Sequence, residues 1–178
     1  TVRDVAVVAQ RYEMVRRIAA EVTDYLVELG TDGRLLSLQL EEFVAGTAEG
    51  QRLVVRDYVS GTAKRPKSTE PILAALANLD SAGLLDLGSI ATALGMPGDI
   101  ESLDSAVRPR GYRILHRIPR LPEAVISNLI SHFGALQKIL SASVEDLRDV
   151  EGVGEARARN IRENLSRIAE SSLMERFA

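Results

Sequence analysis

The sequence predicts an all-α protein in two parts, a helical linker or spine over residues 1–107 and a compact helical domain over residues 108–178. Leu, Ala, Arg and Glu, which favour helix, are abundant, whereas aromatic residues make up only 4% of the chain and Trp is absent. Apolar residues recur at three- and four-residue spacing, and no segment alternates as a half-buried strand does. This composition argues against a β-sandwich and against single-strand-binding surfaces built on stacked aromatic rings.

The composition also limits the chemistry of the chain. Cys is absent, which excludes disulfides, iron–sulfur clusters and thiolate zinc sites and favours a reducing compartment. No apolar run of about 18 residues and no signal-peptide pattern is present, so we expect no membrane association and a cytoplasmic, nucleoid-associated location. Because the chain starts at Thr1 rather than Met, we expect it to be a piece of a longer protein.

The first part is predicted to be helical throughout. Thr1 and Asp4 resemble a capping box that opens a long helix, and Gly30 ends it. Gly and Pro then divide the sequence into shorter segments. We expect helices at 34–45, 53–59, 72–79, 84–94 and 100–107, with a loop at 46–50 and a basic surface loop at 61–68. No motif for chemistry appears in this part, which is typical of a scaffold or spacer.

Charge is distributed unevenly along the chain, although the total is only −3. Residues 1–107 carry 10 Lys and Arg against 16 Asp and Glu, a net charge of −6, while residues 108–178 carry 12 against 9, a net charge of +3. Five Arg and His116 lie between positions 108 and 120 with no acidic residue among them. A basic stretch this local indicates a polyanion as the partner of the second part.

The most specific motif is the turn Gly152-Val153-Gly154, which separates two helical patterns. The two glycines permit a sharp turn and allow a phosphate to approach the backbone, while Val153 can point inward. The helix that starts near Glu155 presents free N–H groups and the positive end of its dipole to that phosphate. This looks like the helix-hairpin-helix signature, with flanking core positions at Leu147, Val150, Ala158 and Ile161.

A second, degenerate copy of this pattern precedes the first. Pro119-Arg120-Leu121-Pro122 replaces the glycine turn, and residues 123–133 form the next helix. Because Pro has no N–H to donate, this copy is expected to hold phosphate through Arg117 and Arg120. Two such units form a compact domain with a pseudo-two-fold axis, which suits the two strands that flank a minor groove. The predicted DNA-binding residues are Arg117, Arg120, Gly152, Val153, Gly154, Arg157, Arg159 and Arg162.

We therefore expect sequence-nonspecific DNA binding, since these contacts reach the phosphate backbone rather than the base edges. The alternative is a helix-hairpin-helix module for protein–protein interaction or oligomerisation, and Asp149, Glu151 and Glu155 near the hairpin support it by repelling phosphate. Enzymes of three kinds are disfavoured. A base-excision glycosylase would carry its catalytic Asp where this chain has Ser172, the acids are too scattered for a nuclease, and no spacing pairs His116 or His132 with metal ligands.

The chain resembles the C-terminal two-thirds of the DNA integrity scanning family of bacterial diadenylate cyclases. The resemblance is carried by residues 109–115, Ile118-Pro119-Arg120-Leu121-Pro122, residues 133–136 and Val150-Glu151-Gly152-Val153-Gly154, and in the hinge by residues 84–87 and 93–95. It implies an N-terminal cyclase domain that joins two ATP into cyclic di-AMP with Mg²⁺, a helical spine, and tandem helix-hairpin-helix motifs that sense branched DNA such as Holliday junctions.

The resemblance further implies a homo-octamer, recombination or repair proteins as partners, and a monovalent cation at the hairpin. The family's Asp-Gly-Ala and Arg-His-Arg active-site motifs do not occur, and Asp32-Gly33-Arg34 lacks both the Ala and the β-rich surroundings. This chain is therefore not expected to be an enzyme or to bind a cofactor of its own. It is expected to be the DNA-sensing arm, with no catalytic residue and no metal site.

Overall fold

The computed structural model describes residues 1–58 and 69–177, and these residues form helices and turns without a strand, which confirms the predicted all-α class. The chain divides into two compact units, Thr1–Val107 and Arg108–Ala178. The basic loop predicted at 61–68 lies outside the described residues. Within the described part, no helix is long and apolar enough to cross a membrane.

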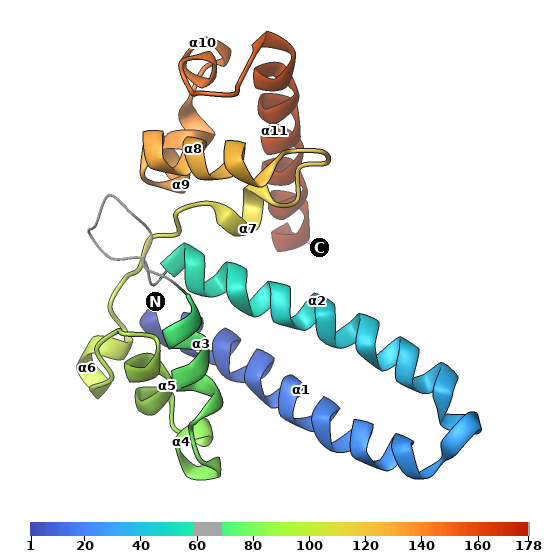
Figure 1. The fold of residues 1–178 in the computed structure, drawn as a ribbon. Coiled ribbons are helices and arrows are strands. Elements are labelled where there is room, and N and C mark those ends of the chain that lie inside the picture. Colours follow the sequence, from blue (N-terminus) through green and yellow to red (C-terminus); the bar gives the residue numbers. More distant parts are fainter. Residues whose placement is uncertain (59–68, 178) are drawn as a thin grey trace. The chain divides into compact units, whose positions relative to one another are not determined.

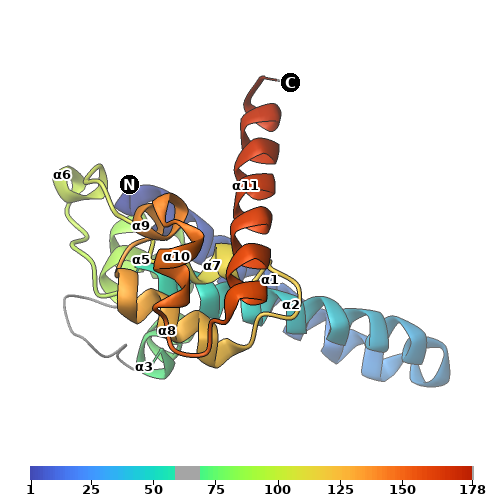
Figure 2. The same ribbon diagram turned by 90° about the horizontal axis from the view of Figure 1, so that it is seen from above.

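Unit 1 is built on an antiparallel pair of long helices, α1 (Val2–Glu28) and α2 (Arg34–Tyr58), joined by the 3₁₀ turn η1 (Gly30–Gly33) (Figure 1). The predicted capping box is present, because the Asp4 N–H donates to the Thr1 hydroxyl oxygen at 3.3 Å and the Asp4 carboxylate accepts from the Thr1 backbone nitrogen at 2.8 Å. The far ends of both helices extend well beyond the remaining helices of the unit (Figure 2).

The predicted loop at 46–50 is wrong, because α2 runs without a break through both of its glycines. Packing explains this result at Gly50. A Cβ atom there would lie 2.6 Å from the Tyr12 hydroxyl, so the glycine is needed where α2 crosses α1 rather than where the chain turns. A glycine inside a helix costs about 1 kcal/mol relative to Ala. The close contact with Tyr12 offsets that cost. The predicted helix at 53–59 is, as far as Tyr58, the last part of α2, and its position 59 lies outside the described residues.

Four short helices cover the base of this pair: α3 (Glu70–Ala77), α4 (Ser81–Leu85), α5 (Leu87–Ala93) and α6 (Ile100–Leu103). The single helix predicted at 84–94 is divided at Asp86. This residue is extended, and its carboxylate accepts the N–H of Gly88 at 3.3 Å and of Ser89 at 2.8 Å, which caps α5. The helix predicted at 100–107 ends earlier, at Leu103.

The core of unit 1 lies where the first half of α1 meets the end of α2 and the short helices (Figure 1). Its fully buried members include Ala6, Ala9, Val54, Leu76, Ile90 and Leu94. Their burial against one another supplies most of the stabilisation of this unit.

One buried charge lies at the edge of this core. Glu13 is only 1% exposed, and its carboxylate accepts hydrogen bonds from Arg16 at 2.6 Å and from Arg17 at 2.9 Å, with the Gln51 amide 3.5 Å away. Arg17 also donates to the Leu79 carbonyl at 2.6 Å, just beyond the end of α3. The ion pair therefore connects α1, α2 and the α3 segment.

Unit 2 contains α7 (Tyr112–Leu115), α8 (Glu123–Phe133), α9 (Leu136–Ser141), α10 (Val144–Arg148) and α11 (Glu155–Phe177). The predicted bounds of α8 are confirmed. Gly134 ends this helix with a φ of 76°, in the left-handed region that glycine occupies readily. Every helix of the unit contributes to a separate core that includes Tyr112, Leu115, Leu129, Ile139, Leu147 and Ile161.

The Glu13 ion pair makes the stability of unit 1 depend on pH. Burial raises the pKa of Glu13, but the hydrogen bonds from Arg16 and Arg17 outweigh it and hold the pKa below its ordinary value of 4.5. The stabilisation is therefore complete above pH 4.5 and is lost as the pH falls through the lowered pKa.

We expect Glu13→Gln to lower the free energy of unfolding at pH 7 by about 2 kcal/mol, because it weakens charge-assisted hydrogen bonds. Urea unfolding at several pH values measures this, and the difference from the parent should shrink as the pH falls below 4.5. Glu21→Gln, at an exposed position of the same helix, is the control and should behave as the parent. A difference that is constant from pH 7 to pH 3 would contradict the assignment.

Candidate nucleic-acid interface

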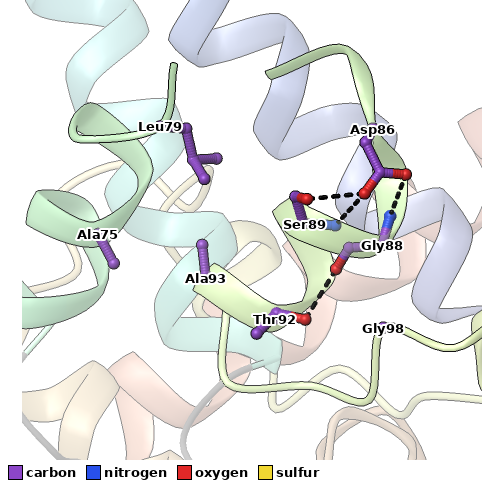
Figure 3. A pocket seen from close by; sticks show the side chains of 8 residues that line it. All are labelled: Ala75, Leu79, Asp86, Gly88, Ser89, Thr92, Ala93 and Gly98. Atoms are coloured by element: carbon purple, nitrogen blue, oxygen red, sulfur yellow. Dashed lines mark hydrogen bonds between the residues drawn. The ribbon is translucent and has the colours of Figure 1, made fainter. Parts of the chain in front are cut away.

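An open hollow of about 560 Å³ lies between α3 and α5 in unit 1 (Figure 3). Its polar groups are already engaged within α5. Figure 3 shows the Asp86 carboxylate bound to Gly88 and Ser89, and the Thr92 hydroxyl donating to the Gly88 carbonyl at 2.9 Å. The remaining lining residues carry no polar side chain: Ala75, Leu79, Ala93 and Gly98. The predicted hairpins of unit 2 are therefore the candidate functional site.

The two hairpins have the same backbone turn, displaced by 32 positions from Arg120 to Gly152. Both residues are left-handed, with φ of 60° and 82°, and Arg120 is the only described non-glycine residue with a positive φ. The Leu121 N–H donates to the Ile118 carbonyl at 3.4 Å, and the Val153 N–H donates to the Val150 carbonyl at 3.0 Å. The degenerate copy therefore turns as the glycine copy does, with an arginine at the left-handed position.

The helices on each side of the hairpins repeat with the same displacement. Before the turn, the Leu115 N–H donates to the Gly111 carbonyl and the Leu147 N–H to the Ser143 carbonyl. After it, α8 begins one residue beyond Pro122 and α11 one residue beyond Gly154. Equivalent positions are buried in both copies, as in the pairs Leu115 and Leu147, Ile118 and Val150, Ile126 and Ala158, and Leu129 and Ile161.

The outer side of the second hairpin is open. Gly152 and Gly154 are exposed, whereas Val153 is buried as predicted. A Cβ atom at Gly154 would meet nothing within 4 Å, and one at Gly152 would meet only the Val125 methyl at 3.2 Å. The N–H groups in the first turn of α11 have no acceptor inside the helix, so they can donate to an anion beside the glycines.

Asn128 holds this hairpin in place. Its side-chain amide, on α8, donates to the Glu151 carbonyl at 3.1 Å. Helix α8, which belongs to the first copy, thereby fixes the turn of the second hairpin. Sequence reasoning did not identify Asn128, because a polar residue on an exposed helix face gives no signal of its partner 23 positions away.

The first hairpin has fewer backbone amides at its turn than the second and offers more of its contacts through side chains. Pro119 and Pro122 have no N–H, and α8 has no side-chain cap. Arg117 and Arg120 are exposed, and neither guanidinium has a partner among the described residues. These are the two predicted site arginines that the protein leaves fully available.

The three predicted arginines of α11 are placed differently. Arg157 is exposed and donates to the Gly152 carbonyl, and Arg159 is exposed and paired with Glu155. Arg162 is half-buried and donates to the Leu140 carbonyl at 2.5 Å, which connects α11 with the end of α9. Arg162 therefore has a packing role in addition to any external contact.

The acidic residues at the helix starts are also paired. The Glu123 carboxylate lies 3.6 Å from the His116 ring nitrogen Nδ1, and Glu155 binds Arg159. Pairing with the Arg159 guanidinium reduces the repulsion that the Glu155 carboxylate exerts on an approaching anion. Asp149 and Glu151 remain exposed near the second hairpin.

Comparisons with known proteins agree with this division of the chain. Residues 1–103 match the family described as the DisA bacterial checkpoint controller linker region, and residues 113–167 match the SAM-like helix-hairpin-helix tandem. The first match covers more than half of the chain. The chain belongs to the DisA family.

Relatives named DNA integrity scanning protein DisA are similar over almost the whole chain. The protein of Streptomyces coelicolor is 61% identical over 178 residues, covering 99% of this chain and 48% of the relative. That of Streptomyces avermitilis is 60% identical with the same coverage, and that of Kineococcus radiotolerans is 54% identical over 177 residues, 99% and 49% of the two chains. The chain thus spans about half the length of the curated relatives it matches.

The left-handed backbone at Arg120 affects the free energy of unfolding of unit 2 in this DisA-family chain. A non-glycine residue in this region costs on the order of 1 kcal/mol, which glycine does not incur. Arg120→Gly should therefore raise the free energy of unfolding of unit 2, despite the greater freedom of glycine in the unfolded chain. Arg117→Gly, in the turn just before it, should lower that free energy instead, and thermal unfolding of both variants measures the contrast.

Proposed function

We propose that unit 2 binds DNA without sequence preference, by holding backbone phosphates at its two hairpins. The observation that carries this proposal is the repetition of one corner at an interval of 32 residues, with both outer sides exposed. Helix starts with free N–H groups are anion sites, and two such corners related by a pseudo-two-fold axis match two antiparallel phosphate strands. Contacts of this kind position the protein and carry no base information.

The two hairpins would bind phosphate by different means. At the second, the backbone amides near Gly154 and α11 donate to the phosphate, with Arg157 and Arg159 adding positive charge nearby. At the first, the guanidiniums of Arg117 and Arg120 take that role, since prolines replace the donors. The left-handed turn places the Arg120 side chain at the outer corner, where its phosphate would lie.

A monovalent cation at the second hairpin would need a backbone carbonyl that faces outward. The Gly152 carbonyl accepts a hydrogen bond from Arg157. The guanidinium therefore already places a positive charge at this carbonyl, and we propose that the hairpin holds phosphate without a cation there.

A more specific biological role for this DNA binding can be proposed from the family. We propose that the chain is the DNA-sensing arm of a cyclic di-AMP synthase, that it responds to branched DNA such as Holliday junctions, and that it acts on the nucleoid together with recombination or repair proteins. ATP and Mg²⁺ would belong to the cyclase domain. In a homo-octamer several arms are displayed together, so junction preference would arise from simultaneous binding by more than one arm.

Gly154→Leu is the sharpest test of the second hairpin. The open space around this glycine and its ordinary φ allow the variant to fold, while the leucine side chain fills the position of the phosphate. We expect affinity for a duplex to fall about tenfold, equivalent to about 1.4 kcal/mol, in a fluorescence anisotropy titration. Ser166→Leu, exposed three turns along α11, is the matched control and should bind as the parent.

Unchanged DNA affinity in folded Gly154→Leu would exclude the amide corner as a phosphate site. Loss of a protein partner without any effect on DNA would instead favour the interaction-module alternative.

The first hairpin is tested through salt dependence. With about four phosphates neutralised, the plot of log affinity against log salt concentration should have a slope of about −3.6. Arg117→Ala and Arg120→Gly should each reduce that slope by about 0.9 for all duplex sequences alike. Arg120→Gly is informative because it should bind DNA more weakly while being more stable than the parent. A steep dependence on base sequence with a flat salt response would contradict backbone binding.

A further inference from the structure

Helix α8 of the first copy lies directly against the second hairpin. In both views the segment between α10 and α11 passes beside α8 (Figures 1 and 2). A Cβ atom at Gly152 would lie 3.2 Å from the Val125 methyl, and the Asn128 side-chain amide donates to the Glu151 carbonyl at 3.1 Å. Val125 and Asn128 are three positions apart, so both contacts lie on one face of the helix. The Glu151 carbonyl therefore points from the turn towards α8.

The direction of this carbonyl fixes the direction of the next amide. The peptide bond between Glu151 and Gly152 is planar and trans, so its N–H points opposite to its C=O. Because the C=O is held against α8, the Gly152 N–H is aimed away from that helix. Gly152 is exposed, and its N–H has no acceptor among the described residues. It is therefore a hydrogen-bond donor that faces solvent on the outer side of the hairpin.

The equivalent peptide of the first hairpin is not held in this way. The displacement of 32 positions that relates the two hairpins takes Asn128 to Asn160. The acceptor equivalent to the Glu151 carbonyl would be the Pro119 carbonyl. Asn160 is exposed, and its side-chain amide donates to no group in the part of the chain that the structure describes. Of the two hairpins, the second is thus the one whose turn peptide is oriented by a side chain.

This difference matches the proposed means of binding at each hairpin. A guanidinium on the long side chain of Arg117 or Arg120 can turn towards a phosphate wherever the backbone points. A backbone N–H has no such freedom, so it donates well only if the turn already presents it in the right direction. A fixed orientation also lowers the entropy that is lost when DNA binds. The hairpin that relies on amides is the one whose peptide is held.

We propose that Asn128 is a positioning residue for DNA binding, which aims the Gly152 N–H at a backbone phosphate by holding the Glu151 carbonyl. Asn128 itself does not contact the DNA. The inference rests on the proposed phosphate site at the second hairpin, and it makes that site depend on a helix of the first copy. The two hairpins are then not independent modules, because a side chain of one copy determines how well the other binds.

Asn128→Leu removes the donor and keeps a side chain of similar size. Leu favours helix more than Asn does and position 128 is half-buried, so the variant should fold, which circular dichroism and thermal unfolding check. We expect duplex affinity in a fluorescence anisotropy titration to fall about fivefold, as for the loss of one net hydrogen bond. Asn160→Leu, the same substitution at the equivalent position, is the matched control and should bind as the parent. Equal losses in the two variants would overturn the proposal.

A double variant separates positioning from a general loss of stability. In Gly154→Leu the phosphate is already displaced, so adding Asn128→Leu should cause no further loss of affinity. Losses that multiply in the double variant would contradict the proposal. If Gly154→Leu itself binds as tightly as the parent, the phosphate site of the second hairpin is wrong. If Gly154→Leu binds weakly and Asn128→Leu binds as the parent, only the role of Asn128 is wrong.

Nuclear magnetic resonance gives a signature that reduced stability alone would not produce. In isotope-labelled parent protein saturated with duplex, the Gly152 amide proton should move downfield because it donates to a phosphate. In Asn128→Leu this change should be lost, while the amide resonances of the first hairpin respond to DNA as in the parent. Asn128→Ala, which removes the donor without adding apolar surface, should give the same result. An equal Gly152 shift in the parent and both variants would refute the aiming of this amide by Asn128.

Discussion

The functional part of this chain depends on one constraint, the left-handed backbone at position 120 and again at position 152. Only that conformation turns the chain sharply enough for Ile118 and Leu121, or Val150 and Val153, to point inward on both sides of a corner. Once these side chains are inside, the two helices of each copy must diverge from the turn with the start of the second helix exposed. The openness of the corners is thus a consequence of how the core is closed, and the proposed phosphate site lies at the same place.

Much of the fold could be predicted from the sequence because its signals are local. The capping box at Thr1 and Asp4, the glycine that ends α8 and the start of α11 after Gly154 each depend on neighbouring residues only. The error at residues 46–50 occurred because a distant residue decides the structure there. Gly50 belongs to a helix because Tyr12 packs against it, and a local pattern cannot show a contact across 38 positions. Asp86 divides a predicted helix because its carboxylate caps the next one, a signal that apolar spacing alone conceals.

The candidate site shows the same limit. The glycine turn could be recognised because few other sequences satisfy its geometry. The equivalence of Arg120 with Gly152 could have been found by aligning the two copies at 32 residues, but the prolines on either side obscure it. The partners of Arg157 and Arg162 could not be predicted, since each is a backbone carbonyl that folding brings within reach. The pair of Arg159 with Glu155 has the i,i+4 spacing that a helix predicts. All eight predicted residues lie in unit 2, and the structure distinguishes available cations from those already engaged.

The difference between the corners bears on how such a protein can change over generations. A contact made by main-chain amides survives most mutations that leave Gly152 and Gly154 in place, so the second hairpin sets a lower limit to the proposed DNA affinity. A contact made by Arg117 or Arg120 is lost by a single nucleotide change and regained as readily. Among descendants of this sequence, differences in DNA affinity should therefore accumulate at the first hairpin, between Pro119 and Pro122. The contribution of the second hairpin should vary less.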